Sequence, residues 1–494
     1  MFNKTGKWKF VLLISFLPAI LAFSGCATVG PDYSPPEKKI PESWHSETMG
    51  GVIQHAPAPE MLAKWWSTLD DPLLTDLMEK AVANNKDVNQ AQARIREERA
   101  RRNMSKAGLF PTLDASGSFR KSKSGRETGS GKETDLYSAD FDAGWELDIF
   151  GGARRSLEAA TAEVQAGEED FRDILVSLLA EIALNYTDVR IFQARMDSVE
   201  KNLAIQDQSY QMAQALYASG LSKETAVEQA KYGLENTRSQ IPGLRISLEE
   251  AKNRIAVLIG ENPGSVHEIL KMKRPIPSCP KEIAVGVPAD VLRQRPDIRR
   301  AERKLAAQTA RIGEATAELY PKFTLSGSIG FEAFDPDRLF LSGSRSYSFG
   351  PRISWPIFRA GSIRSNVEVQ SALEEQLLGK YESAVLNALS EVENQLTVFM
   401  EEQNRRQSLN EAKQAAMRAV DLAQGQYQAG MIDFTGVLDA QRSLLSFEDN
   451  LIQCEGDIIS GAVRLYKALG GGWTSLADGD TGDGPEKREY ENHE

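Results

Sequence analysis

Apolar and polar residues alternate strictly in four short segments of the chain. Leu113 to Phe119 and Tyr137 to Ile149 carry apolar residues or glycine at odd positions and polar residues or glycine at even positions. The alternation returns in Phe323 to Phe331 and in Tyr347 to Ile357. Alternation over about ten residues is typical of membrane-spanning strands, whose apolar side chains face lipid and whose polar side chains face a lumen. The pattern therefore predicts two pairs of such strands.

A soluble antiparallel sheet would show the same alternation and stays an alternative at this point. Aromatic residues near the strand ends favour the membrane, because aromatic girdles mark the two interfaces of a barrel. They are Tyr137, Trp145, Tyr347 and Trp355. Pro351 and Pro356 lack amide donors, so we expect them near a rim or at a distorted register.

Apolar residues recur at steps of three and four from about Ser156 to Ala218 and from about Arg364 to Gln428. Each stretch predicts a helix on the order of 90 Å long. After Gly220 and Gly430 the chain returns as a coiled-coil heptad, which Pro242 should kink in the first case. Two shorter helices are expected to run into the first and third strands, at about Leu73 to Lys106 and Ala289 to Leu319.

These elements occur twice along the chain, at a constant offset of about 210 residues. Phe110-Pro111 recurs as Tyr320-Pro321, Tyr217 to Gly220 recurs as Tyr427 to Gly430, and the heptads keep the same offset. We therefore expect two internal repeats. The expected organisation is a signal peptide (1–25), an N-terminal linker (26–64), a first repeat (65–260), a connector (261–288), a second repeat (289–470) and an acidic disordered tail (471–494).

The N-terminus has the three parts of a secretory signal. Lys4, Lys7 and Lys9 precede an apolar run, 10–23, that ends just before Ser24-Gly25-Cys26. The small residues before Cys26 predict that this thiol is acylated and becomes the new N-terminus. An ordinary signal peptide with an incidental cysteine is the alternative.

Composition excludes several functions. The net charge of −12 argues against binding to nucleic acid, and the sequence contains no nucleotide-binding loop and no catalytic arrangement, so we expect no enzyme. Cys279, Cys454 and four scattered histidines predict neither a disulfide framework nor a metal site. Beyond the signal no run of about 18 apolar residues occurs, so we expect any span to be a β-barrel. Four strands cannot close one, since about eight are needed, so the chain should oligomerise.

With these features the chain resembles the outer membrane factor family, the TolC-like exit ducts, and in particular its NodT-type lipoprotein branch. The resemblance covers nearly the whole mature chain and rests on four motifs: Cys26 to Tyr33, Trp65-Trp66 before Asp71-Pro72-Leu73, Arg293 to Ile298 before Ala301-Glu302, and Leu438 to Arg442. It implies a mainly α fold with a transmembrane β-barrel part, in which a homotrimer builds twelve strands and a periplasmic helical tube. The lipid on Cys26, palmitate among its acyl chains, would be the only attached group, with no further cofactor.

The resemblance also implies the function. The expected molecule is an outer membrane channel of a tripartite efflux system that conducts small molecules passively, powered by an inner membrane RND-type pump and joined to it by a periplasmic adaptor. The residues that match Asp439 and Arg442 line the periplasmic constriction in the family, so the resemblance implies a gate there. The two residues lie three positions apart on one helix face, and an ordinary surface ion pair is the alternative. Asp140, Asp142, Glu146 and Asp148 would face the lumen and favour cations, or serve only as solvated spacers.

Two other functions stay open at this stage. The same architecture could serve type I protein secretion, with an ABC exporter as its partner. A lipid-anchored coiled-coil scaffold with a small soluble sheet and no pore belongs to a different class. Lipidation and the NodT-like motifs favour tripartite efflux over type I secretion, and the scaffold without a pore stays open.

Overall fold

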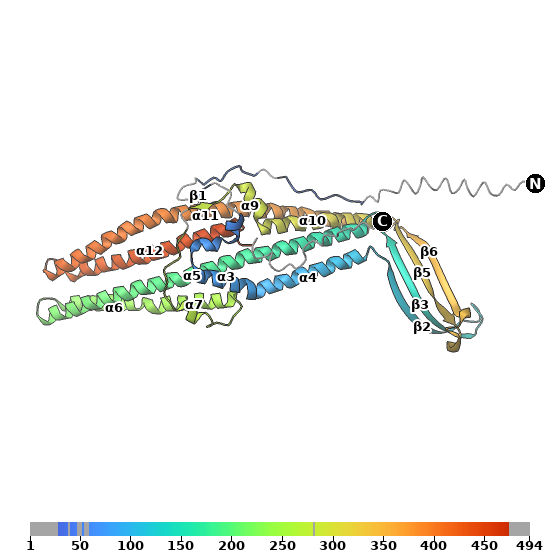
Figure 1. The fold of residues 1–494 in the computed structure, drawn as a ribbon, viewed down its shortest axis with the longest axis horizontal. Coiled ribbons are helices and arrows are strands. Elements are labelled where there is room, and N and C mark those ends of the chain that lie inside the picture. Colours follow the sequence, from blue (N-terminus) through green and yellow to red (C-terminus); the bar gives the residue numbers. More distant parts are fainter. Residues whose placement is uncertain (1–27, 38–39, 47–51, 54–58, 280–281, 474–494) are drawn as a thin grey trace, which may run out of the picture. The chain divides into compact units, whose positions relative to one another are not determined.

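The computed structural model describes residues 28–37, 40–46, 52–53, 59–279 and 282–473 (Figure 1). They form two compact units. Among the described residues, the first unit contains 28–37, Arg94–Glu168 and Arg300–Glu382, and the second contains 40–93, Glu169–Arg299 and 383–473. Each unit takes segments from both halves of the sequence, so compactness in space does not follow the repeat boundaries.

The first unit holds a four-stranded antiparallel sheet with the order β2-β3-β5-β6. Its strands are β2 (Thr112–Lys123), β3 (Glu133–Leu147), β5 (Lys322–Ala333) and β6 (Arg345–Ser354). The four predicted strands are thus present, but β3 and β6 end earlier than predicted, so that Ile149, Trp355 and Ile357 lie outside them. The expectation of a rim position or a distorted register is wrong for Pro351, which lies inside β6 and pairs in regular register with Leu325. β6 is an edge strand, where a residue without an amide donor is tolerated. Pro356 follows the end of the strand.

The two predicted long helices are α5 (Gly152–Ala218) and α11 (Ser362–Gln428), of 67 residues each. Both end in a left-handed glycine, Gly220 at φ 72° and Gly430 at φ 71°, whose amide bonds back to the last turn. The chain then returns as α6 (Glu224–Arg238) and α7 (Gln240–Leu258) in the first copy and as the single helix α12 (Phe434–Ala468) in the second.

The predicted interruption of the first return helix is confirmed and lies at Ser239, between α6 and α7. Pro242 has no amide hydrogen to donate to the carbonyl of Arg238, four residues earlier, and its ring crowds that carbonyl. The helix therefore breaks just before the proline.

The two shorter helices were each predicted as one element, which is wrong. The structure has α3 (Pro72–Asn84) and α4 (Lys86–Ala107), then α9 (Pro288–Gln294) and α10 (Pro296–Ala317). Asn85 separates the first two because its Oδ1 accepts from the amides of Asp87 and Val88 and so starts a new helix. Arg295 separates the second two because it precedes Pro296, and its ψ of 122° is extended.

Equivalent elements of the two repeats keep one offset. α4, β2 and α5 precede their copies α10, β5 and α11 by the same number of positions. The internal repeat inferred from recurring sequence motifs is therefore a repeat of whole helices and strands. Several small elements have no such copies among the described residues: β1 (Val52–Ile53) paired in parallel with β4 (Ile283–Ala284), α2 (Pro59–Ala63), the 3-10 helix η1 (Trp65–Leu69) and α8 (His267–Leu270).

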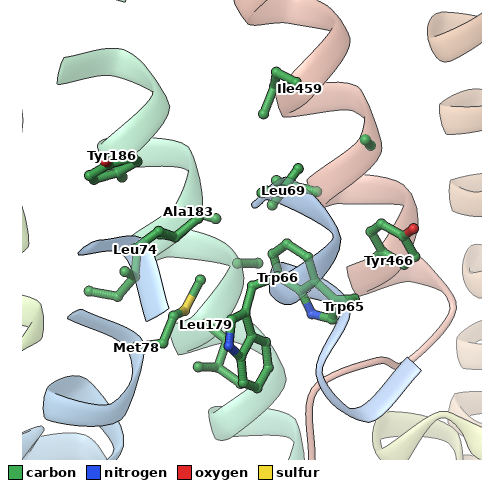
Figure 2. Packing of buried hydrophobic residues seen from close by; sticks show 14 of the residues in the cluster. Trp65, Trp66, Leu69, Leu74, Met78, Leu179, Ala183, Tyr186, Ile459 and Tyr466 are labelled. Carbon is green, nitrogen blue, oxygen red and sulfur yellow. The ribbon is translucent and has the colours of Figure 1, made fainter. Parts of the chain in front are cut away.

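The main core of the second unit forms around η1, α5 and α12 (Figure 2). Trp65 is 1% exposed and stacks on Tyr466 with 5.4 Å between ring centroids. Residues 471–473, assigned to the disordered tail, instead pack on this core. The amide of Gly472 bonds the carbonyl of Leu62, and the ring of Trp473 lies under the guanidinium of Arg172 at 4.6 Å. Positive φ at Gly470 and Gly472 permits the turn that brings them there. The rest of the predicted tail lies outside the described residues.

Candidate functional site

The sheet of the first unit has one apolar and one polar face. Residues that pair across strands share a face, and the pairing joins Leu113 with Ala143, Trp145 with Leu325, and Phe323 with Ile353. The apolar side chains are exposed in the single chain, for example Phe349 at 82% and Tyr347 at 77%. An apolar face of this size is a surface that another apolar phase or partner covers.

Aromatic residues border this apolar face at both ends, as predicted. Phe119 and Tyr137 form a ring pair at one end, with centroids 4.8 Å apart. At the other end the indole of Trp145 donates to the carbonyl of Leu109 at 3.0 Å. Trp355, at the equivalent position of the second repeat, donates to Leu319 in the same way. From Tyr137 to Trp145 the strand is about 27 Å long, which at the usual tilt of a barrel strand spans most of the apolar band.

Three of the four candidate lumen acids lie on the polar face of β3. Asp142 accepts from the hydroxyl of Ser116 at 3.2 Å, and Glu146 lies 3.8 Å from the ammonium of Lys322. Asp140 lies over Gly330, where a Cβ would overlap its carboxylate, so a side chain there would displace it. These acids therefore line one continuous polar surface.

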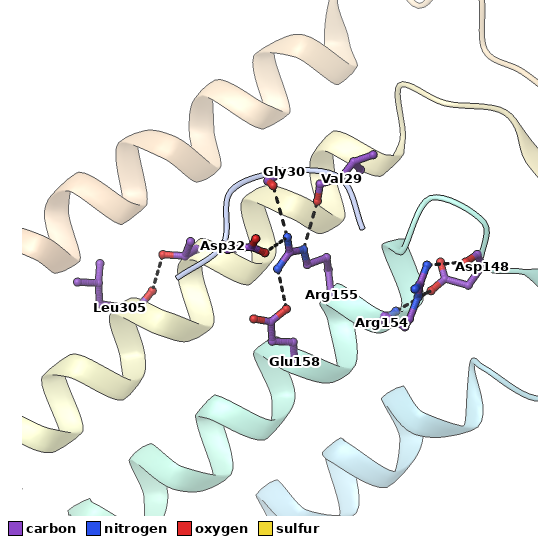
Figure 3. A network of polar contacts seen from close by, with 9 residues as sticks. Val29, Gly30, Asp32, Asp148, Arg154, Arg155, Glu158 and Leu305 are labelled. Atoms are coloured by element: carbon purple, nitrogen blue, oxygen red, sulfur yellow. Dashed lines mark hydrogen bonds and ion pairs between the residues drawn. The ribbon is translucent and has the colours of Figure 1, made fainter. Parts of the chain in front are cut away.

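Asp148 has a different place. It follows the end of β3, and its carboxylate accepts from the amides of Ala153 and Arg154 in the first turn of α5 (Figure 3). It also pairs with the Arg154 guanidinium at 3.0 Å and is 15% exposed. A carboxylate at a helix N-terminus satisfies free amides and the helix dipole, so Asp148 anchors the strand to the helix and does not join the other three acids.

The residues just after the predicted lipidation site are held by Arg155 (Figure 3). Its guanidinium donates to the carbonyls of Val29 and Gly30 and to the carboxylate of Asp32. A Cβ on Gly30 would overlap the backbone of Gly313, so only glycine lets the segment approach α10. Cys26 itself lies outside the described residues.

The candidate gate residues lie near the start of α12. Asp439 and Arg442 are both exposed on one side of the helix. They do not pair with each other: the Arg442 guanidinium lies over the ring of Tyr232 in α6, 5.2 Å from its centroid, and in the part of the chain that the structure describes the Asp439 carboxylate has no ion-pair partner. An unpaired carboxylate is free to meet charges of another molecule.

Arg442 also borders a cleft of about 610 Å³ between α6 and α12. Its walls are polar, and the buried Oε1 of Gln206 has no hydrogen-bond partner among the described residues. Tyr232 and Arg442 occupy equivalent positions of the two repeats. Only the second repeat therefore has two charged residues at these positions, since the first repeat has Gln229 in place of Asp439 and Tyr232 in place of Arg442.

Two further findings concern the residues that the structure describes. Among the residues described, no helix combines the length and apolar character needed to cross a membrane. In the same residues no group of three His, Cys, Asp or Glu side chains is placed to hold a metal ion.

Comparison with known proteins decides the family. The model of the family described as "Outer membrane efflux protein" matches residues 77–261 and 287–471. The chain belongs to this family. The two matched ranges are related by the same offset as the repeated helices and strands, so the family pattern itself occurs twice.

Relatives of this efflux protein extend over nearly its whole length. Nodulation protein T of Rhizobium leguminosarum bv. trifolii is 31% identical over 460 residues, which cover 92% of this chain and 97% of the relative. Cation efflux system protein CusC of Escherichia coli O6:H1 is also 31% identical, with the same coverage of both chains. The solved outer-membrane channel OprN shares 35% of its residues and superposes with a TM-score of 0.86 over 90% of this chain and 100% of its own.

The protein is therefore an outer membrane channel component of a tripartite efflux system and not an enzyme, and it has the TolC-like fold. The apolar face of the sheet is its lipid-facing surface, and the helices belong to the periplasm. Efflux is thereby favoured over protein secretion and over a scaffold without a pore.

The sequence did not single out Arg155 or Tyr232. For Arg155 a signal existed, because Gly30, Gly151 and Gly313 mark places where backbones approach closely. For Tyr232 the signal was the offset of the repeat, because Tyr232 is the residue of the first copy that corresponds to Arg442 in the second.

Proposed function

We propose that three copies of the chain close one twelve-stranded barrel. The observation that carries this proposal is that β2 and β6 are both edges of the sheet, so each leaves a row of backbone groups without partners in the single chain. Lipid does not tolerate an open sheet edge, and four strands are too few for closure. Pairing of β6 with β2 of the next copy satisfies both edges.

Through this barrel the protein conducts small molecules passively, with energy from an inner membrane RND-type pump and a seal from a periplasmic adaptor. The absence of nucleotide-binding and catalytic motifs in the sequence supports passive conduction. Relatives that match over nearly their whole length are named for nodulation and for cation efflux. This difference supports selection of the cargo by the pump, with no cofactor in the channel.

Asp140, Asp142 and Glu146 face the lumen in this proposal and raise the local concentration of cations. Asp148 has no part in it, because its carboxylate caps α5. The lipid on Cys26 anchors the N-terminus in the periplasmic leaflet.

Asp439 and Arg442 form the periplasmic gate. In the trimer three Asp439 carboxylates gather near the axis, where like charges repel unless cations neutralise them. Arg442, held beside Tyr232 in its own chain, supplies that charge to a neighbouring copy. A partner that displaces Arg442 would thus open the passage.

Assembly is tested by the mass of the purified protein in detergent and by its mobility on unboiled gels. We expect a trimer that dissociates on boiling. A water-soluble monomer after removal of the acyl chains would contradict the barrel.

The gate is tested by conductance in planar bilayers. The double variant Asp439→Ala, Arg442→Ala should raise the conductance of the closed state, whereas Gln229→Ala, the equivalent position of the first repeat, should leave it unchanged. Unchanged conductance in the double variant would exclude the gate and leave the barrel proposal intact.

A further inference from the structure

The connection between β5 and β6, residues 334–344, is ordered yet displays apolar side chains. Asp335 accepts from the amide of Asp337, and the hydroxyl of Ser344 donates to the carbonyl of Arg338 at 2.7 Å. Two short 3-10 helices, η2 (Pro336–Arg338) and η3 (Ser342–Ser344), complete it. Nevertheless Phe334, Phe340 and Leu341 are 72%, 73% and 56% exposed.

This connection extends the lipid-facing side of the sheet. The ring of Phe340 packs edge-on against Phe331, with centroids 5.6 Å apart, and Phe331 belongs to the apolar face. β5 follows α10 directly, so the β5–β6 connection lies at the end of the sheet remote from the helices. Because the helices are periplasmic, this end lies at the outer leaflet.

The two repeats differ at this level of the sheet. In the first, Lys121 is paired in register with Asp135, and their charged groups lie 3.7 Å apart. The equivalent positions of the second repeat hold Phe331 and Arg345, which are likewise paired in register. At this level the second repeat thus has phenylalanine in place of the lysine and arginine in place of the aspartate, so its cation is paired in register with an aromatic ring.

Arg345 is exposed, and among the described residues its guanidinium has no ion-pair partner. It lies on the same face as Tyr347, one of the aromatic residues of the girdle. A cation beside apolar side chains at a membrane interface is matched by the phosphate of a lipid headgroup, and the exposed rings and Leu341 are matched by its acyl chains.

We propose that Arg345, Phe331, Phe340 and Leu341 form a binding site for a phosphorylated, multiply acylated glycolipid of the outer leaflet. The guanidinium binds a headgroup phosphate, and the apolar side chains pack along an acyl chain. Each copy of the chain carries one such site.

The test uses the full-length channel in detergent and counts bound lipid by native mass spectrometry. The probe is lipid A with both phosphates; the comparison lipids are its dephosphorylated form and phosphatidylglycerol. We expect Arg345→Gln to weaken binding of lipid A about tenfold, the loss expected for a charge-assisted hydrogen bond, and Arg345→Lys to weaken it less. Phe340→Ser should weaken binding as well.

Lys121→Gln is the matched control, because Lys121 lies at the equivalent level on the same face but is neutralised within the chain. Equal weakening by Lys121→Gln and Arg345→Gln would contradict a specific site. Equal binding of the dephosphorylated lipid would exclude the phosphate contact, and equal binding of phosphatidylglycerol would exclude a glycolipid. Heat-sensitive trimers and unchanged conductance verify that each variant is assembled.

Discussion

Arg155 donates to the carboxylate of Asp32 at 2.7 Å, although the two side chains differ greatly in exposure, 3% for Arg155 and 89% for Asp32. The guanidinium also serves the carbonyls of Val29 and Gly30 at 3.2 and 3.4 Å. The buried arginine, more than the exposed carboxylate, therefore fixes the N-terminal segment on the start of α5.

Arg155→Ala should lower the free energy of unfolding by about 3 kcal/mol, because it removes a buried charged group together with several hydrogen bonds. Urea unfolding of the protein in lipid vesicles measures the change. Asp32→Asn is the control, and its effect should stay below about 1 kcal/mol, since Asp32 is exposed and screened. Equal losses of unfolding free energy in Arg155→Ala and Asp32→Asn would contradict the conclusion that the contacts of Arg155 with the Val29 and Gly30 carbonyls dominate.

Tyr232→Leu should release Arg442 from α6 and favour opening. A cation–π contact at an exposed position is worth about 0.5–1 kcal/mol, so the open probability should change about two- to fivefold. Single-channel recording measures it. Tyr232→Phe keeps the ring and should behave as the unmodified protein. If Tyr232→Leu also gated like the unmodified protein, the contact between Tyr232 and Arg442 would have no role in gating.

Tyr186→Phe should destabilise the second unit by about 1–3 kcal/mol at neutral pH. The Tyr186 hydroxyl donates to Asp71 and accepts from Arg190 at 2.8 Å. Burial, with the hydrogen bond to Asp71, raises the pKa of Tyr186 to about 12.

The unfolded chain therefore releases this proton at lower pH than the folded one, and stability should be full below about pH 10 and fall between about pH 10 and 12. Circular dichroism across this range measures the fall. The phenylalanine variant should lose this part of the pH dependence, and an identical profile in both proteins would contradict the assignment.

Asn85→Ala should cost about 2 kcal/mol of stability, because it removes the cap of α4 and a tertiary hydrogen bond. The Asn85 side-chain amide now donates to the carbonyl of Leu258 at 2.9 Å, and the substitution leaves that carbonyl without it. Thermal unfolding measures the loss. Asn85→Asp keeps the cap but not the amide donor, so its effect should be smaller; a larger effect would show that the contact with Leu258 dominates.

Much of this fold could be predicted from the sequence because it depends on local periodicity. The four strands and the helices α5 and α11 follow from steps of two, three and four residues. The break at Asn85 could not be predicted in this way, because the side chain acts both as a cap and as a tertiary contact with Leu258. The break at Arg295 had a local cause, the following proline, which the apolar pattern concealed.

The candidate site was predictable only in part. Asp140, Asp142 and Glu146 share a face because alternation in a strand fixes the side on which each residue lies. Asp148 follows the same parity but lies beyond the strand end, where a helix N-terminus takes its carboxylate. The position of Trp473 depended on a turn through Gly470 and Gly472 that composition alone assigned to a polar tail.

The constant offset between the two repeats has a consequence for stoichiometry. In a trimer, six helical hairpins surround the axis, and they are of two kinds that alternate. A partner protein that contacts only features common to both kinds of hairpin has six equivalent binding sites. A partner that contacts Arg442, or the break at Ser239, has three. A ring built from one kind of chain can therefore bind a partner assembly of either threefold or sixfold symmetry.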